Sequence, residues 1–159
     1  MSEFLISHQQ QPCSLSCFAT CMAMLMARPA EAVREHIHNS YREKGLSLGE
    51  VLDSLELPFS DFKTAGRNNI DKPGVWVAAV PSLNLVGIMH QVLVEVLPSG
   101  TWAVFDPNAG KEGKRFYVAG EGLDPELAVP FTSGYTVEAF ISREDLAAYR
   151  AKRSSEAAA

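Results

Sequence analysis

The sequence has no apolar stretch of the ~18–20 residues that a membrane-spanning helix requires. The richest stretch, from Phe18 to Ala27, contains Thr20 and is followed by Arg28, so we expect it to be a buried helix. Basic runs are also absent and the formal net charge is -5, which argues against nucleic acid and anionic membranes as partners. The N-terminus lacks the basic start and apolar centre of a secretory signal. We therefore expect synthesis in the cytoplasm, with export as an effector by a route without a cleaved signal left open.

Cysteine is scarce, with Cys13, Cys17 and Cys21 all lying within nine positions. An odd, clustered set is not the pattern of a disulfide framework, so we expect free thiols. These cysteines with His8 could be considered as zinc ligands, but one helix face cannot surround a metal, and structural zinc sites draw ligand pairs from two segments. A glycine-rich nucleotide loop is also missing, so the sequence implies no metal and no other cofactor.

What the chain does contain is an ordinary globular composition, 47% hydrophobic and 21% charged over 159 residues. That length is enough for one domain with a substantial core. Neither an internal repeat nor a linker divides the sequence. We predict a single domain over residues 1–153 and a disordered tail at 154–159.

The first half of the chain has helical patterns and the second half has strand patterns. We predict a helix from Ser16 to about Ala27 and a second from Pro29, in its first turn, to about Tyr41. A third, short helix follows the capping-box pattern of Ser47 and Glu50 and ends at Pro58. The predicted strands are 74–80, 90–97, 101–105, 115–118 and 135–141, and a last helix runs from 143 to about 152. This order predicts an α+β fold, with N-terminal helices packed on a C-terminal antiparallel β-sheet.

Cys17 is the residue with the clearest chemical potential. It stands in the first turn of the first predicted helix, where the helix dipole favours a thiolate. A thiolate is the nucleophile that attacks acyl and amide carbons. Gln11, six residues earlier, can donate a hydrogen bond to the oxyanion that forms. We assign Cys21, within the apolar helix, and Cys13, before it, to packed and inert positions.

A base and its orienting partner are available in the second half of the chain. Of the four histidines, only His90 opens an apolar strand; we expect the other three to be solvated. Asp106 ends the next strand, and antiparallel pairing brings the start of one strand beside the end of its neighbour. A neutral imidazole can take the thiol proton, and a carboxylate can fix the imidazole tautomer. Asn108 is an alternative orienting residue, since an amide can also serve.

The segment from Gln11 to Ala19, QPCSLSCFA, resembles the pattern Q-G-x-C-G-S-C-W-A of the papain-like cysteine peptidases. A closer likeness is to the small bacteriocin-processing peptidases that cleave double-glycine leaders, whose helix is similar to Cys17–Leu25, CFATCMAML. The chain departs from these patterns at Leu15 and Phe18. Further similar segments are 45–48, 72–75, 90–94 and the pair 106–107.

This resemblance implies a papain-like fold and a role for each candidate residue. Cys17 would be the nucleophile, His90 the base and Asp106 the orienting residue. Gln11 and the backbone N–H of Cys17 would hold the oxyanion. Substrate contacts are expected from Phe18, Trp76 and Met89.

The predicted chemistry is acyl transfer, and it leaves the acyl donor open. The leading interpretation is a peptidase acting on a peptide or protein. If the enzyme releases ammonia from a glutamine side chain, it is a deamidase. If an amine replaces water in the second step, it is an acyltransferase. Small bacterial effectors and toxins that resemble papain include enzymes of this kind. A non-catalytic module that binds a peptide is the alternative from a different class. A long groove would favour a peptidase, and a narrow pocket would favour a deamidase.

Overall fold

The computed structural model describes residues 3–38, 43–59, 69–120, 124–132 and 134–158. They form three helices, a series of strands and a last helix, the α+β fold that the sequence predicts. No helix in these ranges is long and apolar enough to span a bilayer. The elements are α1 (Cys17–Met26), α2 (Ala30–His38), α3 (Leu48–Ser54), β1 (Gly74–Pro81), β2 (Met89–Val96), β3 (Trp102–Phe105), β4 (Phe116–Val118), β5 (Ala128–Pro130), β6 (Thr136–Ile141) and α4 (Arg143–Ala158).

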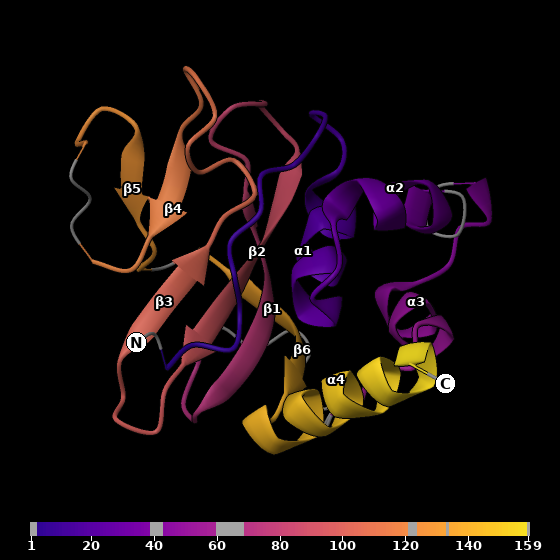
Figure 1. Cartoon of the computed structure of the whole chain (residues 1–159). Helices are drawn as coiled ribbons and strands as arrows, with labels where there is room; N and C mark the ends of the chain where they lie inside the picture. The colour runs from indigo at the N-terminus through magenta and orange to yellow at the C-terminus, as the bar shows by residue number, and fades with distance from the viewer. Residues whose placement is uncertain (1–2, 39–42, 60–68, 121–123, 133, 159) are drawn as a thin grey trace.

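All four helices lie on one side of an antiparallel sheet, and the short strands β4 and β5 lie on its other side (Figure 1). Val75 and Val77 of β1 belong to the core between sheet and helices. Trp76 and Ala78 belong to a second core that includes Tyr117 of β4. Because both faces are covered, β1 and β2 are buried along almost their whole length. This explains why the sequences of β1 and β2 are largely continuous apolar runs instead of alternating apolar and polar residues.

The order of strands in the sheet is β3-β2-β1-β6, and every neighbouring pair is antiparallel. His90, near the start of β2, pairs with Val80 of β1. On the other side of β2, Leu93 pairs with Phe105, which is the last residue of β3. The chain therefore leaves β3 beside the beginning of β2, which brings the residue after Phe105 close to His90.

α1 is buried from Phe18 to Leu25. A helix that packs on all sides is apolar all round, as this one is. It ends at Ala27, whose left-handed conformation (φ 53°) lets its N–H bond the last turn. It begins at Cys17, so the predicted thiol is the first residue of the helix.

The segment before α1 is held in place by buried charged side chains. The carboxylate of Glu95, fully buried in β2, accepts the N–H groups of Leu5 (2.8 Å) and Ile6 (3.0 Å). Arg143 of α4 pairs with the same carboxylate at 2.5 Å. Arg150, also of α4, donates to the carbonyl of Leu5 and to two carbonyls at the end of α1. One ionic cluster thus joins the N-terminal segment, the sheet and the first and last helices.

Several predicted elements are confirmed with small changes of boundary. The capping box is present, with Ser47 accepting the N–H of Glu50 and Glu50 accepting that of Ser47. α2 begins at Ala30 rather than at Pro29, whose carbonyl instead accepts the N–H of Ala32. The predicted end of this helix near Tyr41 lies outside the described residues. Pro81 is part of β1, paired with Met89, rather than its stop.

Two elements differ more from the sequence prediction. β5 was not predicted, and it pairs in parallel with β4 over three residues, too few for a period-2 pattern to be visible. α4 continues through Ala158 instead of ending near Lys152. Residues 154–158 are therefore helical rather than a disordered tail, in keeping with the helix propensity of alanine and glutamate.

Candidate active site

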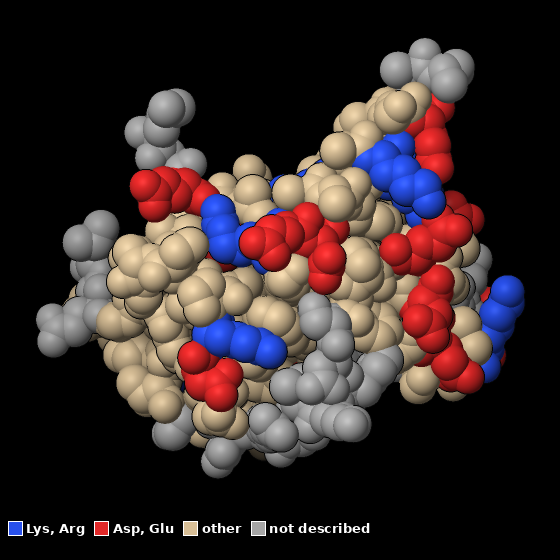
Figure 2. Space-filling model, turned by 90° about the horizontal axis from the view of Figure 1, so that it is seen from below, with Lys and Arg blue, Asp and Glu red and all other residues tan. Residues whose placement is uncertain are grey.

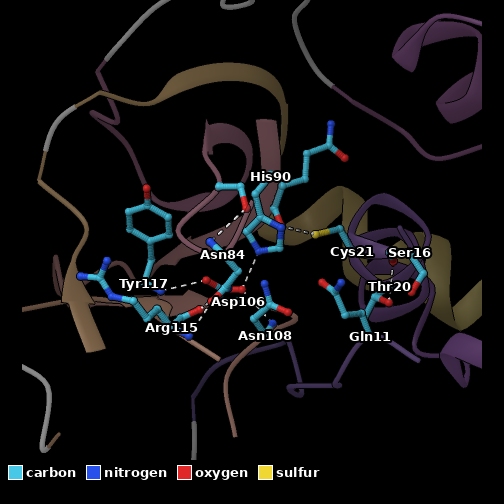
Figure 3. A network of polar contacts seen from close by, with 12 residues as sticks. Gln11, Ser16, Thr20, Cys21, Asn84, His90, Asp106, Asn108, Arg115 and Tyr117 are labelled. Atoms are coloured by element: carbon cyan, nitrogen blue, oxygen red, sulfur yellow. Dashed lines mark hydrogen bonds and ion pairs between the residues drawn. The ribbon is translucent and has the colours of Figure 1, made fainter. Parts of the chain in front are cut away.

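His90 and Asp106 form a buried pair at the edge of the sheet. Nε2 of His90 lies 2.6 Å from Oδ1 of Asp106. Figure 3 shows the two side chains pointing toward each other. The same oxygen accepts the N–H of Asn108 at 2.8 Å, and Oδ2 accepts the N–H of Tyr117 at 2.8 Å. The carboxylate is thus fixed by two backbone groups and can hold the imidazole ring in one orientation. Asp106, not Asn108, is the partner of the ring.

Cys17 meets the imidazole from the other side. The two side chains line the same cleft and shift each other's pKa; because Nε2 faces Asp106, Nδ1 is the ring nitrogen left for the sulfur. Burial by itself would raise the pKa of Cys17, but the hydrogen bond and positive charge of His90, with the N–H groups of Gln91 and Phe18, bring it below 9.0. The result is an environment that favours a thiolate.

The pKa of His90 is shifted in the direction opposite to that of Cys17. Burial alone would lower the pKa of the ring. The hydrogen bonds to Asp106 and Cys17 and their negative charges outweigh that effect and raise the pKa of His90 to about 9. The raised pKa of the imidazole and the lowered pKa of the thiol together favour a thiolate–imidazolium pair at neutral pH.

Gln11 lies across the site from His90 and Asp106 (Figure 3). Its backbone N–H donates to the carbonyl of Pro107 (2.9 Å), and its own carbonyl accepts Nζ of Lys111 (2.9 Å). The side-chain amide donates to the carbonyl of Cys13 at 2.8 Å. An amide nitrogen carries two hydrogens, so one remains for the cleft that Gln11 lines together with Cys17 and His90.

The cleft beside the thiol is small. It offers about 120 Å³ of space, well below the ~300–1,000 Å³ of sites that bury a drug-sized ligand. Its far wall is the loop between β1 and β2, residues 82–88, which contributes Leu85 and Ile88, with Met89 following at the start of β2.

Of the three predicted substrate contacts, only Met89 lines the cleft. Phe18 is 6% exposed and packs in the core between helices and sheet. Trp76 is 1% exposed; its indole N–H donates to the carbonyl of Lys72 and its ring contacts Phe140. The predictions for Phe18 and Trp76 are therefore corrected. The error arose because α1 is buried from Phe18 to Leu25 and β1 is buried on both faces around Trp76, so that neither side chain can reach a substrate.

Several cleft residues were missed by the sequence analysis. Leu85, Ile88, Lys111 and Lys114 line it from two loops. The loops are joined by Asn84, whose side chain exchanges two hydrogen bonds of 2.9 Å with the backbone of Arg115. The apolar composition of a segment that links two strands was the only signal in the sequence that could have found this wall.

The other two cysteines differ from each other. Cys21 is fully buried, bonds the carbonyl of Gln91, and burial raises its pKa well above 9.0. Cys13, predicted to be inert, is only partly buried. What burial it has raises its pKa, but hydrogen bonds from Ser16 and the Leu15 backbone and the charge of Arg34 lower it below 9.0.

His8, which the sequence analysis considered with the cysteines as a zinc ligand and expected to be solvated, is exposed, and its Nε2 lies 2.8 Å from the backbone oxygen of Asp106. Over the described ranges, no group of three or more His, Cys, Asp or Glu side chains is arranged to hold a metal ion.

Comparisons with models of protein families, with curated proteins and with solved structures found no match to this chain.

Proposed function

We propose that this protein is a papain-like cysteine hydrolase that cleaves an amide bond, with a peptidase as the leading form. The observation that carries the proposal is the position of His90, which is buried against the carboxylate of Asp106 and lines the same cleft as Cys17. A nucleophile, a base and an orienting group in one hydrogen-bonded line are the general signature of covalent catalysis at a carbonyl. A helical layer that carries the thiol at a helix start, and a sheet that carries the base, also support the papain-like arrangement.

In the first half of the reaction, the Cys17 thiolate attacks the carbonyl carbon and forms a C–S bond. The side-chain amide of Gln11 and the backbone N–H of Cys17 donate to the oxyanion. This second donor is in the first turn of α1, where N–H groups have no partner within the helix. Loss of one donor of this kind typically costs ~100–1,000-fold in rate.

In the second half, His90 supplies and then recovers a proton. The imidazolium protonates the nitrogen of the leaving amine as the C–N bond breaks, which leaves a thioester on Cys17. His90 then takes a proton from water, whose oxygen attacks the thioester. The products are a carboxylic acid, an amine and the regenerated thiolate–imidazolium pair, and Asp106 holds the ring throughout.

The test is the rate at which iodoacetamide alkylates each cysteine between pH 4 and pH 9, with labelled sites located by mass spectrometry. We expect fast labelling of Cys17 at pH 5–6, slowed in His90→Ala. Cys13 is the internal control, since its lowered pKa is due to Ser16, Leu15 and Arg34 and not to His90. An ordinary thiol profile for Cys17, with a midpoint near ~8.5 and no response to His90→Ala, would contradict the proposal and favour a peptide-binding module.

Deamidation of a glutamine side chain is a second candidate, favoured by the small size of the cleft. The same residues would perform it, with ammonia as the leaving group instead of a main-chain amine. Peptide cleavage and ammonia release, measured on the same substrate mixture, separate the two activities.

A further inference from the structure

The exposed large apolar side chains of this protein gather at one place. Among the described residues they are Leu15, Leu85, Val86, Ile88 and Met89, between 40% and 103% exposed. Four of these five line the cleft that holds the thiol. We call Leu15, Leu85, Ile88 and Met89 the apolar rim. An apolar cluster on an otherwise polar surface marks a binding site more often than chance.

The loop that carries Leu85 and Ile88, two of the four rim residues, is fixed by hydrogen bonds within the loop and to its neighbour. The N–H of Ser82 donates to the carbonyl of Ile88 at 2.8 Å, which closes the loop. The Ser82 hydroxyl accepts the N–H groups of Asn84 and Leu85. Asn84 is tied in turn to Arg115 in the neighbouring loop. The rim is therefore a preformed surface, which reduces the entropy lost on binding.

The cleft also carries positive charge. Lys111 and Lys114 line it, and among the described residues no aspartate or glutamate does. Nζ of Lys111 bonds a neutral group, the carbonyl of Gln11, and the ion pairs found among the described residues include neither lysine. This contrasts with the net charge of -5 and with the face seen from below, where acidic and basic side chains are interspersed (Figure 2).

Val86 extends the same surface outside the cleft. It belongs to the loop of the rim and is fully exposed, yet it does not line the cleft. A small amide held at the thiol would leave Val86 uncovered. A polypeptide that continues past the reacting bond would cover it.

We propose that the substrate is a polypeptide that places an apolar side chain against the rim and an acidic side chain opposite Lys111 and Lys114. This inference rests on the proposed function. It holds for cleavage of the main chain and for deamidation alike, because both require the same segment to lie in the cleft.

The first test uses the full chain and a synthetic positional-scanning library of decapeptides. Mass spectrometry reads new termini, which report cleavage, and gains of about one dalton at glutamine, which report deamidation. We expect reacted peptides to be enriched in Leu, Ile, Val, Met or Phe at one position and in Asp or Glu at another. Reaction without these preferences would overturn the inference, as would no reaction by a protein whose Cys17 is rapidly alkylated. Slow alkylation of Cys17 would instead count against the proposed function.

The second test uses variants outside the catalytic machinery and the best peptide from the library. Ile88→Ser should raise KM about tenfold, in the range that one apolar group contributes to discrimination, and Val86→Ser should raise it less. Lys114→Glu should invert the preference, so that a peptide with lysine in place of its acidic residue becomes the better substrate. Turnover of p-nitrophenyl acetate, which occupies only the thiol site, should be unchanged in Val86→Ser, because Val86 does not line the cleft.

The matched control for charge is Lys152→Glu, an exposed residue of α4, a helix from which no residue lines the cleft. This variant should keep the preference for a peptide with an acidic residue. Equal effects of Lys114→Glu and Lys152→Glu would show a general charge effect and overturn the acidic part of the inference. An unchanged KM in Ile88→Ser would overturn the apolar part.

Discussion

At the scale of single residues, the central feature is an imidazole ring held from both sides. His90 bonds the carboxylate of Asp106 through Nε2, and the Cys17 thiol lies in the same cleft and raises the pKa of the ring. Each partner favours the protonated ring, and the protonated ring favours the thiolate. The reactive form of Cys17 is therefore a property of the group of three residues.

The first prediction concerns the dependence of kcat/KM on pH. The rate should rise as Cys17 loses its proton, at a pH below 9.0 because its pKa is lowered, and fall as His90 loses its proton near pH 9. A bell-shaped profile with its alkaline midpoint near 9 is expected from initial rates on a fixed peptide. An alkaline midpoint near 6.5, the ordinary value for histidine, would mean that the ring is not held as described.

The second prediction is for Asp106→Asn. The amide removes the negative charge that supports the imidazolium, so the pKa of His90 should fall and the alkaline limb should move to lower pH. We expect kcat to fall by about 100-fold or more, in the range of general acid–base contributions. Asn108→Asp is the control, since Asn108 meets Asp106 through its backbone N–H; a comparable loss there would point to a general disturbance of the loop.

At the scale of elements, β1 is the strand on which the sheet depends, because it pairs with both β2 and β6. It begins at Gly74, whose φ of 142° is rarely adopted by other residues. A Cβ there would overlap the ring of Phe140 and lie 2.9 Å from the carbonyl oxygen of Ile141. Glycine is required at this point by β6, not by a turn.

The third prediction follows from that close approach. Gly74→Ala should destabilise the protein by about 1–3 kcal/mol, the usual cost of overpacking, measured by urea unfolding. Gly100→Ala is the matched control, since Gly100 also has a positive φ (89°) but has open space around it. If the two variants lose the same stability, backbone conformation alone explains the loss and the contact with β6 is not responsible.

The elements also show which features the sequence could predict. The capping box of α3 and the closeness of His90 and Asp106 follow from local rules, namely side-chain caps and antiparallel pairing. The positions of Phe18 and Trp76 could not be predicted, because which face of α1 or β1 is covered depends on the packing of distant elements. The rim was missed for the same reason: Leu85 and Ile88 look like core residues until the fold places their loop at the cleft.

At the scale of the whole molecule, the ionic cluster around Glu95 links segments from the two ends of the chain. The fourth prediction is that Glu95→Gln loses about 1.5–3 kcal/mol, the value of hydrogen bonds to a buried charged group, in urea unfolding. It should also lower kcat, because the segment that carries Gln11 loses an anchor.

The control for this variant is Glu56→Gln. Glu56 pairs with Arg153 at 2.7 Å, but its side chain is 69% exposed. An exposed pair contributes about 0–1 kcal/mol, so this variant should be nearly as stable as the unmodified protein and fully active. A stable Glu95→Gln protein with normal kcat would show that the anchor is not needed.

The strand order has a consequence for the protein while it is being made. Synthesis proceeds from the N-terminus at ~5–20 residues per second, so Cys17 emerges from the ribosome long before His90 does. β6, which borders β1, and Arg150, which binds the end of α1, emerge later still. The nascent chain therefore carries an ordinary thiol, and its reactive form awaits the last-made part of the fold.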